Sequence, residues 1–240
     1  MNARWRFWLI TVAAILAILG TLLLGRWQLS RAEQKNAIQA SIDQRAALPA
    51  LSGAALSTLG NPVSEIHRRV VLEGVWVPEY TVFLDNRPMN GKPGFYVVTP
   101  FRLVGSDAVF LVQRGWVARN FMDRTQVPVV ATPEGPVQIQ GRIAPPPAKL
   151  YEFSDAQGGR IRQNLNPATF AIESGLALRP GSVQQLGAAT EGLLRQWPQV
   201  ATGVEKHHGY AFQWFALSSL IFILYVWFQI VRRFVLPQRR

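Results

Sequence analysis

The sequence has no cysteine and only three histidines among 240 residues. The lack of cysteine excludes disulfide bonds, zinc–thiolate sites and thiol catalysis. The spacings that bind metals or nucleotides are also missing, since there is no H-x-x-x-H, H-E-x-x-H, P-loop or G-x-G-x-x-G. A Ser-His-Asp triad would depend on His67, and no G-x-S-x-G accompanies it. The acids are scattered singly, so the sequence shows no enzyme active site.

Acidic residues are absent from both ends of the chain, which has a net charge of +11. All fourteen acids lie between Glu33 and Glu205, whereas arginines gather at the two ends. A basic chain suggests nucleic acid as a first partner. Here the strongest positive charge sits in short tails beside apolar runs, which favours a membrane protein with no nucleic-acid partner. The terminal arginines are Arg4, Arg6, Arg232, Arg233, Arg239 and Arg240.

Two long runs carry no charge, and they predict two transmembrane helices at residues 7–25 and 209–231. The first has 19 residues and the second 23, so each is long enough to cross a bilayer. The first run could instead be a cleaved signal peptide. It is long for that role, however, and no small-x-small cleavage site follows it, so we expect an uncleaved anchor.

The arginines at the ends predict the orientation of the chain. Positive charge next to a span stays on the cytoplasmic side, so the tails 1–6 and 232–240 should both be cytoplasmic. The region from Arg26 to His208 should then face the periplasm. We expect a multi-pass protein of a bacterial inner membrane, or of the mitochondrial inner membrane if the source is eukaryotic. Such short tails leave no room for a kinase or cyclase domain.

The region between the spans predicts a helical stalk at 26–48 and a β-rich extracytoplasmic domain at 49–208. The stalk has apolar residues at helical spacing and ends before Pro49. The domain contains several short β-branched and aromatic runs separated by turn residues. One short helix is expected from Asn166 as the N-cap to Leu176. The fold class is therefore α+β: two transmembrane helices flanking a mainly β domain with one or two helices.

Arginines alternate with aromatic residues through the β-rich region. One interpretation is that the arginines lie at solvated strand ends and the tryptophans lie in the core. The other is a surface that binds carboxylates, such as haem propionates or an acidic partner. The residues concerned are Arg68, Arg69, Trp76, Arg87, Arg102, Arg114, Trp116 and Arg119.

The start of the second span, "EKHHGYAFQWFALS", offers the strongest candidate for a binding site. Lysine, histidine, tyrosine and tryptophan are common at membrane interfaces, so these residues could serve only as anchors. On a helix, however, five residues of this stretch share one face, namely three with rings and two small ones that would leave room for a ligand. An imidazole nitrogen is a usual ligand of haem iron. The five residues are His207, Tyr210, Ala211, Trp214 and Ser218.

Five separate stretches, in the same order, resemble the surfeit locus protein 1 family of cytochrome c oxidase assembly factors. The resemblance covers both spans and most of the loop up to about Ile143, and it is thin from Pro145 to Val204. The stretches are "LGRWQLSRAEQK", "RRVVLEGVW", "LDNRPMNGKPGFYVVTPF", "FLVQRGWVARN" and "HHGYAFQWFALS".

The resemblance implies a non-enzymatic factor that receives haem A as a transient cargo. It implies that the factor promotes insertion of this haem into the catalytic subunit of a haem-copper oxidase. The expected partners are that subunit, membrane lipid and, as a further candidate, haem A synthase. The histidine of the family's second span corresponds to His207, three residues before Tyr210. His207 is therefore the expected axial ligand of the haem iron, with Tyr210 and Trp214 beside it.

Two other interpretations are open at this stage. The first is a two-span scaffold that holds an oxidase subunit through its β-rich domain and never binds haem. The second is a periplasmic enzyme on a membrane tether, which the sequence supports least because no catalytic motif accompanies it. Haem content of the purified protein separates the haem-binding factor from the scaffold.

Overall fold

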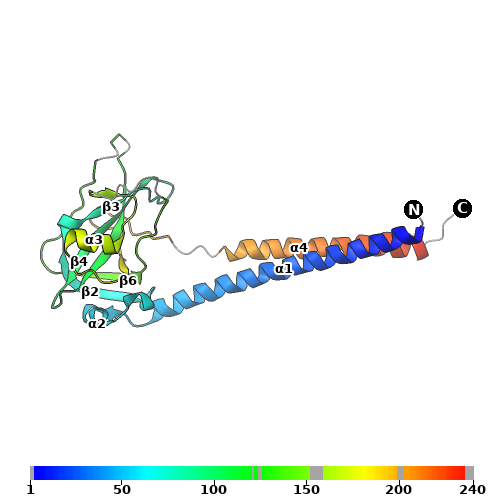
Figure 1. Ribbon diagram of the computed structural model, residues 1–240, viewed down its shortest axis with the longest axis horizontal. Coiled ribbons are helices and arrows are strands. Elements are labelled where there is room, and N and C mark those ends of the chain that lie inside the picture. The colour runs from blue at the N-terminus through cyan, green and yellow to red at the C-terminus, as the bar shows by residue number, and fades with distance from the viewer. Residues whose placement is uncertain (1–2, 121, 124–125, 152–158, 199–202, 236–240) are drawn as a thin grey trace. The chain divides into compact units, whose positions relative to one another are not determined.

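The computed structural model describes residues 3–120, 122–123, 126–151, 159–198 and 203–235. The chain divides into two compact units. One unit combines Met1–Ser41 with Val200–Arg240, and the other is Ile42–Gln199. The first unit is helical and the second is mainly β (Figure 1). The α+β class predicted from the sequence is confirmed.

The helical unit contains the two apolar runs. Helix α1 (Ala3–Ala47) includes residues 7–25 and continues without a break through most of the predicted stalk. Helix α4 (Val204–Tyr225) continues as the π-helical segment η3 (Val226–Val235). Both helices are long and apolar enough to cross a membrane. Helix α4 begins five residues before the predicted span, so His207 and His208 belong to its first turns rather than to the β domain.

Helices α1 and α4 lie side by side and antiparallel (Figure 1). The least exposed residues of each helix repeat every three or four positions. This spacing keeps one face of each helix turned towards the other, and we call the two rows the helix seam. Its α1 row is Phe7, Thr11, Ala14, Ile18, Thr21, Gly25, Gln28, Ala32 and Lys35. Its α4 row is Val204, His207, Ala211, Trp214, Ser218, Ile221 and Tyr225.

Small residues allow the two helices to approach closely at the middle of the helix seam. A side chain added at Gly25 would place its Cβ 2.6 Å from the Phe215 ring, so only glycine fits without a shift. Ala211 and Ser218 are almost fully buried. Towards the chain ends, the hydroxyls of Thr11 and Tyr225 lie 3.0 Å apart and share a hydrogen bond. Close packing and hydrogen bonds between helices are the interactions that hold transmembrane helices together.

The β unit is built on an eight-stranded sheet that closes on itself. The sheet order is β1-β2-β6-β8-β5-β4-β3-β7, and an additional pairing of β2 with β4 joins five strands into a ring. Closure removes the unpaired edges of these central strands. The long strands are β2 (Arg69–Trp76), β4 (Gly94–Leu103), β5 (Val109–Ala118) and β6 (Val137–Ala144), and the short ones are β1 (Leu51–Ser52), β3 (Val82–Leu84), β7 (Ile161–Arg162) and β8 (Ser182–Gln185).

Alternation of apolar and polar residues explains which side of each strand is buried. Burial alternates along most of strand β2, which places Val70, Leu72 and Trp76 in the main core. Strand β5 is buried at its first eight residues, because it pairs with β4 on one side and β8 on the other. The core contains Leu56, Val70, Leu72, Trp76, Phe101, Leu103, Phe110, Val112, Ile139, Ile143 and Val183.

Two α-helices and two short 3-10 turns complete this unit among the described residues. They are α2 (Gly53–Thr58), α3 (Pro167–Ser174), η1 (Pro62–Glu65) and η2 (Pro78–Tyr80). Helix α3 is the predicted one: the Asn166 side chain accepts hydrogen bonds from the first turn, and Gly175 ends it at φ 66°.

A β-bulge in β5 places Arg114 inside the β unit. Val97 pairs with Gly115 and Val98 pairs with Gln113, so Arg114 is the extra residue between them. The next residue, Gly115, approaches another segment closely. A Cβ there would lie 2.8 Å from the Leu194 carbonyl oxygen, which is closer than real side chains come to backbone.

We therefore expect Gly115→Val to destabilise the β unit. Overpacking against the Leu194 backbone should lower the free energy of unfolding by about 1–3 kcal/mol. The measurement is protease resistance and denaturant unfolding of the purified full chain. Gly60→Val is the matched control, because a Cβ at Gly60 meets no atom within 4 Å. Equal stability of the two variants would show that the close approach at Gly115 does not constrain the fold.

Candidate functional site

The candidate site lies on the helix seam at the first turns of α4. Gly203 precedes the helix in the left-handed conformation, at φ 55° and ψ 28°. Glycine adopts this conformation at little cost, whereas most residues do not. His207 follows one turn later and is half-buried, while its neighbour His208 is exposed. The structure therefore gives the two adjacent histidines different surroundings.

His207 is bonded to α1 through Gln28. The two side chains meet at 2.7 Å between His207 Nδ1 and Gln28 Oε1. A carbonyl oxygen can only accept, so Nδ1–H donates and carries the proton of the neutral imidazole. Nε2 is then the unprotonated nitrogen, which is the one that can ligate a metal. A hydrogen bond from the other ring nitrogen is the usual way in which proteins orient a histidine ligand.

Positive charges surround His207 at this end of the helix pair. Partial burial, followed by the charges of Lys35, Arg31 and His208, lowers the pKa of His207 from its ordinary value. His207 precedes the uncharged run 209–231, so these charges act outside the predicted span. The lowered pKa favours the neutral imidazole at pH 7, and only the neutral form can bind a metal ion.

The residues of the predicted binding face of α4 do not all lie in the same surroundings. Trp214 is half-buried on the helix seam with His207, whereas Tyr210 is 51% exposed beside it. Ala211 and Ser218 were expected to leave room for a ligand. They are instead packed in the helix seam, and α1 occupies the space beside them. A ligand of His207 would therefore meet the exposed side of α4 at Tyr210 rather than the buried small residues.

The reasoning from sequence missed Gln28 as a member of this site. The signal was present in the stretch "LGRWQ", which places Gly25 and Gln28 three residues apart, and so on one face of α1. Trp27, between them, is 51% exposed and points away from the helix seam. The Arg31 guanidinium lies 5.7 Å from the centre of the Trp27 ring. The same motif thus supplies a seam glycine, a histidine partner and an outward-facing tryptophan.

The arginines and tryptophans of the β unit have mostly structural roles. Trp76 and Trp116 are buried, as the core interpretation predicted, and Arg69 and Arg102 are exposed. Arg114 fits neither interpretation, because it is fully buried.

Arg114 binds the segment before β6 and the segment after β8. It donates to Ala131 O and Thr132 Oγ1 at 2.8 and 2.7 Å, and to Glu191 Oε2 at 2.7 Å. Its guanidinium also stacks 4.5 Å from the Trp76 ring centre. Arg195 lies 3.6 Å from the same Glu191 oxygen. These contacts tie loops to the sheet and leave Arg114 no exposed surface for a carboxylate ligand.

His67, the third histidine, gives no support to a catalytic triad. Partial burial and then the charges of Arg142 and Arg45 lower the pKa of His67. A triad histidine is instead held by a carboxylate. Within the ranges that the structure describes, no three His, Asp or Glu side chains gather as a metal site would require.

Comparison with known proteins places the chain in a family. The model of the SURF1 family matches residues 15–219, which include most of the helix seam, with Gln28 and His207, and the whole β unit. The chain belongs to the SURF1 family. The resemblance seen in the five sequence stretches is thereby confirmed, and the match extends through the region after Pro145. SURF1 membership implies a role in cytochrome c oxidase assembly, as an assembly factor rather than a known enzyme.

Curated relatives from Rickettsia carry the same family name. The "SURF1-like protein" of Rickettsia felis is 29% identical over 214 residues, which cover 85% of this chain and 89% of the relative. That of Rickettsia conorii is 29% identical over 211 residues, covering 85% and 84%. Together with the two apolar helices, these likenesses identify a SURF1 membrane protein that matches its relatives over most of their length.

Proposed function

We propose that this SURF1 protein binds haem A through His207 and delivers it to the catalytic subunit of a haem-copper cytochrome c oxidase. The observation that carries the proposal is the hydrogen bond from His207 Nδ1 to Gln28 Oε1. It fixes one tautomer and one ring orientation, as the second partner of a metal-binding histidine does. His208 is exposed, and no side-chain hydrogen bond of His208 is found among the described residues.

The surroundings of His207 suit a cargo that must be released. A neutral imidazole gives the iron one axial ligand, and the lowered pKa favours this neutral form at pH 7. Tyr210 offers an exposed aromatic ring and Trp214 a half-buried one beside the histidine. Lys35 and Arg31, whose charges act on His207, are cations of the type that pairs with haem propionates. A partly exposed site leaves the haem accessible to the acceptor subunit.

The proposal also includes the membrane setting. The site would lie at the periplasmic surface of a bacterial inner membrane, where α4 starts its uncharged run. The catalytic subunit would be the partner that receives the haem, and haem A synthase is a candidate source. The scaffold interpretation shares this topology and this partner but excludes haem, so haem retention distinguishes the two.

The first experiment compares the two adjacent histidines. His207→Ala should lose haem A, because it removes the iron ligand, while the protein still inserts and folds. His208→Ala should keep most of the haem, since adjacent residues lie about 100° apart on a helix and cannot aim at one site equally. The measurement is haem A per protein after purification from a strain that makes haem A.

Each outcome of this comparison has a distinct meaning. Equal retention by both variants would contradict the assignment of His207 and favour histidines that act only as interface anchors. Loss of haem in the His208→Ala variant alone would show that His208, rather than His207, ligates the iron. Absence of haem from the unmodified protein under the same conditions would favour the scaffold.

Gln28 is expected to act on the haem through His207. Gln28→Leu removes the acceptor at similar size, so the imidazole should lose its fixed orientation and the haem affinity should fall about 10–100-fold. The haem spectrum at saturating haem should also shift, because Nδ1 no longer donates to a carbonyl oxygen. Gln44→Leu, on an exposed position of α1 outside the site, is the matched control. Unchanged affinity and spectrum in Gln28→Leu would contradict a positioning role.

The topology can be tested with single cysteines, because the chain has none of its own. Met122→Cys, at a residue 95% exposed in the β unit, should react with a membrane-impermeant maleimide in spheroplasts. Arg240→Cys should react only after lysis, because the arginines hold the tails in the cytoplasm. Labelling of Arg240→Cys alone in intact spheroplasts would reverse the proposed orientation.

A further inference from the structure

The two flanks of the helix seam differ beside the candidate site. On one flank the Phe215 ring packs against Gly25, where an added Cβ would lie 2.6 Å from that ring. This flank is therefore closed by an aromatic side chain. The other flank carries exposed side chains from both helices, and we call it the open flank. Its members are Trp27 and Arg31 from α1 and Lys206 and Tyr210 from α4.

Helical geometry places the open-flank side chains on one side of the pair. Successive residues turn about 100° around an α-helix. On α1, Trp27 and Arg31 therefore lie about 60–100° from Gln28 in one direction. Gly25 lies about 60° from Gln28 in the other direction. On α4, the two open-flank residues lie on the opposite side of His207 from the phenylalanine that packs against Gly25. The open-flank residues of both helices thus share one side of the helix seam.

The open flank lies at the height of the proposed iron ligand. The hydrogen bond between Gln28 and His207 marks the same height on the two helices. Trp27 is about 1.5 Å along the α1 axis from Gln28, and Arg31 is about 4.5 Å from it in the other direction. Tyr210 is about 4.5 Å along the α4 axis from His207. The charge of Arg31 acts on His207, as expected for neighbours. A ligand of this histidine therefore has the open-flank side chains within one helical turn.

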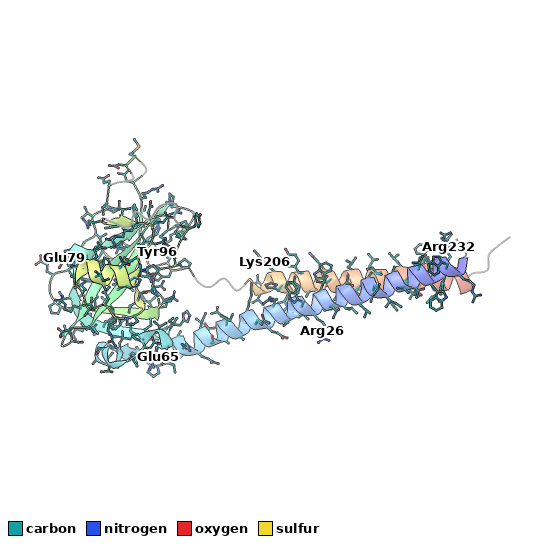
Figure 2. All side chains as sticks on the ribbon, in the orientation of Figure 1. Arg26, Glu65, Glu79, Tyr96, Lys206 and Arg232 are labelled. Carbon is teal, nitrogen blue, oxygen red and sulfur yellow. The ribbon has the colours of Figure 1, made fainter. Side chains whose placement is uncertain are left out.

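The open flank has an apolar part and a charged part. Trp27 and Tyr210, each 51% exposed, lie on the side of the uncharged runs 7–25 and 209–231. Arg31 and Lys206 lie on the side away from these runs, and Figure 2 marks Lys206 at the first turn of α4. Haem A is divided in the same way, since its two propionates share one edge and its farnesyl chain leaves from another. The open flank therefore matches the cargo in polarity.

The contacts of Arg31 can be exchanged for a contact with a propionate. Its guanidinium lies 5.7 Å from the centre of the Trp27 ring and donates a hydrogen bond to Gln34 Oε1 at 3.0 Å. The bond to Gln34 is exposed and has a neutral acceptor, so it is weaker than a charge-assisted bond to a carboxylate. Stacking on Trp27 uses the flat face of the guanidinium and leaves the donors in its plane free to bind a carboxylate.

We propose that haem A bound to His207 lies on the open flank, with Trp27 packed against the porphyrin and Arg31 paired with a propionate. This inference rests on the proposed haem-binding function and adds two residues of α1 that touch the cargo. The propionates face the aqueous side, where Arg31 and Lys206 lie. The farnesyl chain leaves on the side of Trp27 and Tyr210 and enters the lipid. Binding on this flank leaves the closed flank, with Gly25, unchanged.

The first test measures haem A affinity by spectral titration of the purified full chain in detergent, at pH 8, where His207 is neutral in every variant. Trp27→Leu should weaken binding about tenfold, because the ring that packs against the porphyrin is lost. Trp27→Phe keeps an aromatic face and should retain most of the affinity. Phe212→Leu is the matched control, since Phe212 is 74% exposed and lies about 140° around α4 from His207. Equal affinity of Trp27→Leu and Phe212→Leu would overturn the inference and leave Trp27 as an interface anchor.

The second test compares haem A with its dimethyl ester, which has no propionate charge. Arg31→Gln should bind haem A about tenfold more weakly, as expected when one charge-assisted hydrogen bond is lost. The same variant should bind the dimethyl ester as tightly as the unmodified protein does. Arg26→Gln is the matched control, because Figure 2 shows Arg26 on the side of α1 that faces away from α4. Equal losses for haem A and the ester, or equal effects of the two arginine variants, would contradict the propionate pairing.

The outcomes separate this inference from the function on which it rests. If the unmodified protein binds no haem A, or if His207→Ala binds it equally well, the haem-binding function and the placement on the open flank both fail. If His207 is required while Trp27→Leu and Arg31→Gln bind haem A like the unmodified protein, only the placement fails. Weaker binding in both of these variants, with the two control variants unchanged, would support the open flank as the face that holds the cargo.

Discussion

The close approach of α1 and α4 at small residues is the constraint on which the helical unit depends. In a bilayer, apolar side chains gain nothing by leaving lipid for protein, so packing and hydrogen bonds must hold two helices together. Gly25 provides the closest approach, and buried Ala32, Ala211 and Ser218 continue it along the helix seam. With the helices this close, a glutamine on one can reach a histidine on the other. The proposed ligand owes its tautomer to that packing.

The two ends of the helix pair have different chemistry because charge is distributed unevenly along the chain. One end combines imidazole, lysine and arginine with Glu33 and Glu205, the first and last acids of the sequence, near the half-buried His207. The other has arginines with no acidic side chain within about 40 Å along the same helix. The charges at the first end lower the pKa of His207 and favour its neutral form, which the haem-binding proposal requires.

The β unit is held by a second constraint, the burial of one charged side chain. The bulge at Arg114 turns its guanidinium inward, where it must find partners because an unpaired buried charge is strongly unfavourable. Ala131, Thr132 and Glu191 supply these partners from segments far apart in the sequence. Removing one partner of a buried pair typically costs about 3–5 kcal/mol. The region after Pro145 is therefore a structural part of the domain, since it provides both β8 and Glu191.

Local patterns in the sequence were sufficient for the long elements and the class of the protein. Uncharged runs marked the apolar helices, short β-branched and aromatic runs marked strands such as β2 and β5, and Asn166 and Gly175 marked the limits of α3. These features depend on neighbours within a few residues, so the sequence alone determines them. Tertiary structure decided what depends on distant partners: the pairing of β2 with β4, the place of β8 beside β5, and the burial of Arg114. It also paired Gln28 with His207, left Tyr210 exposed and filled the space beside Ala211, because the register of one helix against another is set by the packing of both.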